Sequence, residues 1–209
     1  MNTAARLAML LLLGIACIAC NSQSNAPAPP SSPSCSLLPG DIGNWWIYTD
    51  SSWRDGKLAS VRDDTLRITG TALFQGKTLS IPTDVPLLPS RFLPGCDTVY
   101  IESYGIGGMP FLTPYYIRGT ATMETLFTVI GDVGFYYSAQ ILPDAIVTPA
   151  GAFSSCTRIG MFSQQTVDDT FLFPGVGIIR RNFVADVAHP DNWHNSLTLR
   201  NTNVVLNGR

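Results

Sequence analysis

Two histidines and an aspartate near the C-terminus have the residue types of a metal site. His189, Asp191 and His194 lie in the segment HPDNWH (189–194), and the chain has 2 histidines in all. Imidazole and carboxylate groups are adequate zinc ligands, and bound zinc would support a metal-dependent hydrolase. Pro190 and the Asp-Asn pair after it are typical of a turn, however, and favour a surface loop. We therefore predict no metal and no cofactor, with the hydrolase as the alternative.

Other reactive side chains lack the partners that catalysis requires. Ser154, Ser155 and Cys156 are candidate nucleophiles, but the histidines that could serve as a base lie more than thirty residues away. No G-x-S-x-G nucleophile elbow occurs. The acidic pairs 63–64 and 168–169 are adjacent residues, which point to opposite faces of a strand. We predict strand residues for the first group, turn or strand-start residues for the pairs, and no catalytic residue.

The later cysteines suggest one disulfide and one free thiol. Cys35 and Cys96 each lie near a turn rich in proline and glycine, and they are the preferred pair. Cys156 lies in an apolar, strand-like run, where a buried thiol acting as a small hydrophobic group is the common case.

The N-terminal segment indicates export. Arg6 precedes an apolar run over 7–16, which is too short to span a bilayer and fits a secretory signal. Small residues lead into cysteine twice, at Cys17 and Cys20. This resembles the lipobox of bacterial lipoproteins, in which the signal is cut just before a cysteine that carries the lipid. Cys20 is the favoured lipidation site because a polar segment follows it, and Cys17 is the alternative; an ordinary cleaved signal or an uncleaved anchor would also fit.

The chain divides into three parts on this interpretation. Residues 1–19 are a lipoprotein signal peptide, 20–36 a disordered Ser/Pro-rich tether, and 37–209 a single β domain. The lipid would hold the protein in the bacterial cell envelope. Asn21, rather than aspartate, follows Cys20, which favours the outer membrane, facing the periplasm.

Composition narrows the class of partner. After the signal peptide is removed, 12 Lys+Arg and 15 Asp+Glu give a net charge of −3, and no basic run occurs. Nucleic acid is therefore excluded as an expected partner. Charged residues make up only 13%, about half the usual share, and Gly, Pro and aromatic residues suit strands and turns.

Alternating side chains predict strands along most of the domain. In 44–50, Trp45 and Ile47 share one face and Trp46 and Tyr48 the other. Asp-Gly at 55–56 predicts a hairpin, and 60–71 alternates with Leu66 and Ile68 inward. The expected fold is mainly β: a single curved antiparallel sheet of about seven to ten strands, forming a half-barrel or a small sandwich.

Three further features of the predicted strands bear on binding. Gly175 and Gly177 flank Val176 and indicate a groove that a Trp or Phe side chain fills, with a bound ligand as the alternative. Arg180-Arg181 places one arginine on each face, and a buried one needs a partner. Aromatic residues beside Gly/Pro loops are the candidate ligand face: Phe111, Tyr115, Tyr116, Phe135, Tyr136 and Tyr137.

Two sequence patterns resemble a group of uncharacterised bacterial lipoproteins. One is L-P-x-x-x-G-N-x-W-x-Y, present here at 38–48, and the other is T-P-A-G-x-F-x-x-C at 148–156 followed by P-G-V-G at 174–177. The resemblance implies a curved antiparallel sheet, similar in architecture to the periplasmic lipoprotein carriers that fold a half-barrel around acyl chains. These relatives have no established activity, so no catalytic residue is implied.

Together these features predict a lipid-anchored cell-envelope protein that is not an enzyme. Its expected partners are the membrane, through the N-terminal lipid, and an apolar small molecule or an envelope protein. The alternatives are the metal-dependent envelope hydrolase and a purely structural surface lipoprotein.

Overall fold

The computed structural model describes residues 35–85, 90–104, 108–119, 124–130, 133–163, 166–185, 188 and 193–204. Within them the fold is all-β, as predicted, and twelve strands form one antiparallel sheet in the order β6-β5-β4-β3-β2-β1-β14-β13-β12-β11-β8-β7. Strands β9 and β10 form a separate hairpin. No helix among the described residues is long and apolar enough to cross a membrane.

Most strands follow one another along the chain and pair with their neighbours. Their bounds are β1 Trp45–Arg54, β2 Lys57–Phe74, β3 Lys77–Pro82, β4 Phe92–Leu93, β5 Thr98–Tyr104, β6 Pro110–Ile117, β7 Glu124–Ile130, β8 Val133–Ile141, β9 Ile146–Thr148, β10 Gly151–Phe153, β11 Thr157–Phe162, β12 Val167–Phe173, β13 Gly177–Val184 and β14 Trp193–Thr202.

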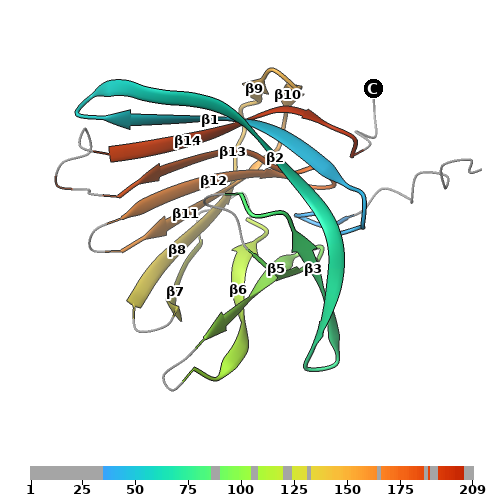
Figure 1. Ribbon diagram of the computed structural model, residues 1–209. Helices are drawn as coiled ribbons and strands as arrows, with labels where there is room; N and C mark the ends of the chain where they lie inside the picture. The colour runs from blue at the N-terminus through green and yellow to red at the C-terminus, as the bar shows by residue number, and fades with distance from the viewer. Residues whose placement is uncertain are drawn as a thin grey trace, which may run out of the picture. The chain divides into compact units, whose positions relative to one another are not determined.

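The sheet curls so strongly that strands near its two edges come together (Figure 1). Gly119, just after β6, lies against the backbone of Gln140 in β8, and a Cβ atom added at Gly119 would be 2.5 Å from the Gln140 nitrogen. Because β6 is one edge strand and β8 is next to the other, this contact marks a seam between the ends of the sheet. The expected strong curvature is confirmed.

Turn chemistry explains the long β1–β2 hairpin. Asp55 and Gly56 have φ values of 52° and 68°, which is the left-handed conformation that a two-residue hairpin turn requires. They join Arg54 to Lys57, which are paired in the ladder. The hairpin predicted from the Asp-Gly pair is confirmed.

The hydrophobic core is concentrated at one end of the sheet, which we call the closed end. Trp46 and Tyr48 from β1 are 0% exposed, and Leu66 and Ile68 from β2 are 1% exposed, so their predicted inward direction is confirmed. The segment before β1 covers this end with the side chains of Leu37 and Leu38.

Gly177 makes room for these side chains. Its φ is 101°, and an added Cβ would lie 2.9 Å from Leu38 Cδ1. The indole Nε1 of Trp46 donates a hydrogen bond of 2.6 Å to the Val176 carbonyl. The groove predicted at the two glycines is therefore filled by protein side chains.

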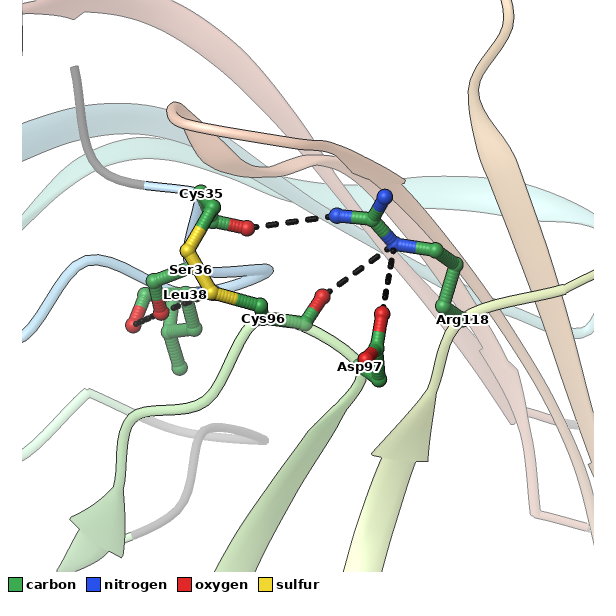
Figure 2. The surroundings of a disulfide bond; sticks show 6 residues. All are labelled: Cys35, Ser36, Leu38, Cys96, Asp97 and Arg118. Atoms are coloured by element: carbon green, nitrogen blue, oxygen red, sulfur yellow. Dashed lines mark hydrogen bonds and ion pairs between the residues drawn. A yellow bond between two sulfur atoms is a disulfide. The ribbon is translucent and has the colours of Figure 1, made fainter.

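A disulfide ties the start of the domain to the turn before β5. It joins Cys35 to Cys96, the pair favoured from the sequence, and Cys156 is free and buried. Figure 2 shows Arg118, which follows β6, donating to both the Cys96 and the Cys35 carbonyl groups and lying 3.4 Å from the Asp97 carboxylate. The disulfide thus lies close to the seam.

Two local predictions were wrong. Asp63 and Asp64 lie in the middle of β2 and not beside a turn, because β2 continues unbroken for 18 residues. Ser154, Ser155 and Cys156 lie between β10 and β11 and not within a strand. Ser155 has a φ of 59°, a left-handed conformation that does not fit a strand.

Candidate functional site

The pairing of β14, β13, β12, β11 and β8 aligns polar and apolar side chains in one row on the inner face of the sheet. Ladder partners share a face, and alternate residues along each strand return to it. In the strand ladders, Asp168 of β12 lies opposite Phe183 of β13 and opposite Met161 of β11. The row is completed by Asn195 in β14 and Tyr137 in β8. The next inner row runs Leu197, Arg181, Thr170, Ile159, Ala139.

The two rows meet in a buried ion pair. Arg181 and Asp168 side chains are each 5% exposed. Nε of Arg181 donates to Oδ1 of Asp168 at 2.9 Å and to Oδ2 at 3.1 Å, and Nη2 also donates to Oδ2. The Thr170 hydroxyl adds a third donor to the carboxylate at 3.2 Å. Asp168 is therefore well satisfied, and the pair carries no net charge.

Two tyrosines reach this pair from the far side of the curled sheet. Nη2 of Arg181 donates to the Tyr115 hydroxyl at 3.3 Å, which links β13 to β6. Tyr116, its neighbour, is fully buried, with ring centroids 4.6 Å apart. We call Tyr115, Tyr116, Tyr137, Asp168, Thr170 and Arg181 the Arg181 cluster.

The Arg181 cluster contains buried polar atoms without hydrogen bonds. Within the described part of the chain, Nη1 of Arg181 and the hydroxyl of Tyr137 make no hydrogen bond, whereas the Tyr116 hydroxyl lies within reach of Thr170 and Tyr115. Each such group costs about 1–3 kcal/mol when left unsatisfied. By contrast, the Trp46 and Tyr48 donors in the core each find a backbone carbonyl. Buried donors in native interiors are satisfied by protein, by ordered water or by a bound group.

The tyrosines of the cluster remain protonated over the physiological range. Burial raises the pKa of Tyr137 and of Tyr116 above the ordinary value of 10, and the pKa of Tyr115 rises for the same principal reason. Their hydroxyls can therefore donate hydrogen bonds as well as accept them.

Beyond the cluster, the inner face turns apolar and half-exposed. This region lies at the ends of β11 and β13 and the start of β14, and we call it the open end. Met161 and Phe183 are half-buried there, and Trp193 is 41% exposed. The Phe183 and Trp193 rings meet edge to face at 5.7 Å. The inner face thus places an apolar surface beside a buried polar cluster, which suits an amphipathic molecule.

The predicted aromatic ligand face is not one exposed surface. Tyr116 and Tyr137 are 1% and 4% exposed, so these two are core residues and do not lie on the surface. Neighbouring strand residues face opposite ways, which is why Tyr136 is exposed on the outside of β8. Phe111 and Tyr115 are half-buried. The side chain of Phe135 lies outside the described residues.

The metal-site candidates are placed only in part. His194, in β14, stacks on Trp53 with ring centroids 4.4 Å apart and an interplanar angle of 11°. His189 and Asp191 lie outside the described residues. Among the residues that are described, no group of three His, Cys, Asp or Glu side chains could hold a metal ion.

Among the candidate reactive residues, Cys156 and the acidic pairs have structural partners. The Cys156 thiol donates to the Phe153 carbonyl at 3.1 Å, and burial raises its pKa to about 11. Asp169 binds Arg158 through both carboxylate oxygens on the outer face, and Asp63 pairs with Arg200. Cys17 and Cys20, the lipidation candidates, lie outside the described residues.

Sequence reasoning treated Asp168 and Arg181 separately and missed their pairing. The signal was present in the alternation: Asp168, Thr170 and Leu172 share a face in β12, and Ile179, Arg181 and Phe183 share one in β13. A charged residue among apolar residues on one face of a strand requires a partner nearby.

The chain is similar in structure to proteins of low sequence identity. No family model matches it, and no curated protein sequence matches it. A "putative lipoprotein" from Parabacteroides distasonis is similar over 82% of this chain and 100% of that chain, with 12% identity and a TM-score of 0.43. A "putative exported protein with YmcC-like fold" from Bacteroides fragilis is similar over 79% and 98%, with 13% identity and a TM-score of 0.42.

Proposed function

We propose that this protein is a lipid-anchored cell-envelope protein that binds an apolar small molecule on the inner face of its sheet. The observation that carries the proposal is the Arg181 cluster, where unpaired polar atoms lie beside the apolar open end. A ligand with an apolar body and a polar end would satisfy both surfaces.

Binding rather than catalysis is supported by the state of the reactive groups. Within the described residues, the Asp168 carboxylate already accepts hydrogen bonds from Arg181 and Thr170. The Cys156 thiol is covered and protonated at neutral pH. Neither group is available as a base or nucleophile.

The membrane anchor in this proposal is the lipidated Cys20, with Cys17 as the alternative. Its support is the apolar run that ends in small residues and cysteine, followed by a polar tether. The expected location is the outer membrane, facing the periplasm. Labelling with an alkyne-tagged fatty acid should be lost in a Cys20→Ala variant and retained in Cys17→Ala.

Native mass spectrometry tests the binding proposal. The chain from residue 21 on keeps the whole compact unit at 33–209 and would be exported to the periplasm and purified without detergent. We expect a co-purified small molecule that is lost when the protein is denatured. A mass equal to that of the chain alone would contradict the proposal, and a retained metal ion would favour the hydrolase.

A further inference from the structure

The charges inside the Arg181 cluster restrict the polar end of the ligand. Arg181 is positive, Asp168 is negative, and the three tyrosines are neutral, so the cluster is neutral as a whole. A ligand carboxylate or phosphate would place a second negative charge next to Asp168 in a buried site. Burying an unpaired charge is far more costly than burying a neutral polar group.

The nearest other charges on the inner face do not change this balance. Asp50 forms an ion pair with Arg62 at 3.2 Å and accepts a hydrogen bond from Asn195 at 3.4 Å. Arg62 also lies 3.2 Å from Asp64. This second group therefore offers no spare positive charge to an anionic ligand.

The unpaired atoms of the Arg181 cluster can each bind an acceptor, whereas the unpaired Oδ1 of Asn195, in the inner row of β14, is itself an acceptor. A guanidinium nitrogen can only donate, and the phenolic hydroxyl of Tyr137 can also donate. An ammonium group, which has no lone pair, would therefore leave Nη1 of Arg181 unsatisfied. A carbonyl oxygen has two lone pairs and no charge, so it can accept from Nη1 and from one hydroxyl together.

We propose that the Arg181 cluster binds the carbonyl group of a neutral acyl ester or acyl amide, with the acyl chain lying over Met161, Phe183 and Trp193. This inference rests on the proposed function, because it names the chemical class of ligand for the same site. It adds that an ionised fatty acid of the same chain length binds more weakly.

A displacement assay with three matched probes tests the inference. The chain from residue 21 on would be loaded with N-phenyl-1-naphthylamine, a neutral fluorescent apolar molecule. Methyl dodecanoate, dodecanamide and dodecanoic acid would then compete for it at pH 8, where the acid is ionised. We expect the ester and the amide to displace the dye at concentrations at least about tenfold lower than the acid.

The outcomes separate the two proposals. Equal or tighter binding of the acid would overturn the neutral-carbonyl inference and leave the proposed function standing. A protein that binds neither the dye nor any of the three probes would overturn both. In that case a bound water molecule is the remaining way to satisfy the polar atoms.

Substitutions locate the bound group. Tyr137→Phe removes one hydroxyl and should weaken the ester about threefold to tenfold, the loss expected for one hydrogen bond. Tyr136→Phe is the matched control, since that side chain lies on the outer face, and it should leave ester affinity unchanged. Equal effects of the two substitutions would contradict the site.

A charge substitution gives an independent test. Asp168→Asn leaves Arg181 without its anion, so the acid should gain affinity relative to the ester. An unchanged preference in the folded variant would overturn the charge argument. If the variant does not fold, the wild-type preference and the Tyr137→Phe result still decide the inference.

Discussion

Neighbouring aspartates in β12 have different environments, and their contribution to stability should differ accordingly. Asp168 faces inward to Arg181, and Asp169 faces outward to Arg158, whose side chain is 41% exposed. Asp168→Asn leaves a buried charge unpaired and should lower the free energy of unfolding by about 3–5 kcal/mol. Asp169→Asn removes a partly exposed pair and should cost about 1 kcal/mol. Urea unfolding measures both, and equal losses would contradict the assigned faces.

Cys156 should make the stability of the domain fall at alkaline pH. Its pKa is raised by burial from 9 to about 11, so the folded state holds a proton that the unfolded state loses first. The stabilisation is complete below pH 9 and is lost as the pH rises to 11, by about 2–3 kcal/mol at most. Between pH 8 and 11, the free energy of unfolding should fall more steeply with rising pH for the wild type than for Cys156→Ala. Parallel curves would show that the thiol does not contribute.

At the residue scale, the sequence predicted on which face of a strand a side chain lies better than it predicted which residue that side chain contacts. The inward direction of Leu66 and Ile68 follows from alternation alone. The partner of Arg181 does not, because ladder register between β12 and β13 decides it. Tyr115 reaches Arg181 across the curled sheet, a contact that depends on curvature that alternation does not specify.

The seam between β6 and β8 should be sensitive to a single added atom. A Cβ at position 119 would lie 2.5 to 2.7 Å from three backbone atoms of Gln140, which cannot move independently. Gly119→Ala should therefore separate the two strands and destabilise the domain by about 1–3 kcal/mol. Gly70→Ala, where nothing lies within 4 Å of the added atom, is the control and should be nearly neutral. Thermal unfolding that ranks the two variants the other way would exclude the seam.

The Cys35–Cys96 disulfide should stabilise the same region. It closes a loop with a sequence separation of 61 residues, for which chain entropy gives about 4 kcal/mol. The double substitution Cys35→Ser/Cys96→Ser should lower the free energy of unfolding by up to that amount. Dithiothreitol should destabilise the wild type similarly and leave the double variant unchanged. A wild type insensitive to reduction would contradict this contribution.

At the element scale, long strands were predictable and short ones were not. The 10-residue β1 shows clear alternation, and the Asp-Gly turn after it has a specific conformation. Strand β4 has 2 residues, and β9 and β10 have 3 each, too few to show a period. The expected seven to ten strands therefore fell short of the twelve that the described residues contribute to the main sheet.

At the scale of the whole domain, the two ends of the sheet differ in how their inner side chains are packed. The closed end holds the densely buried core, and the open end presents half-buried aromatic and thioether side chains. The Arg181 cluster lies between them, and its unpaired atoms are covered by protein. A ligand must displace those covering side chains, so we expect association to be slower than for a preformed surface site. Stopped-flow dye binding should show a rate that saturates with dye concentration; a linear, near-diffusion-limited rate would contradict a covered site.

The most direct test of the account is the position of a bound ester measured by nuclear magnetic resonance. Methyl dodecanoate carrying a ¹³C label in the methoxy group would be added to the chain from residue 21 on, and intermolecular Overhauser effects recorded. We predict contacts from the methoxy group to the Tyr137 ring and from the acyl chain to Met161 and Trp193. Contacts confined to exposed outer side chains such as Leu73 and Tyr104, or no contacts at all, would contradict binding on the inner face.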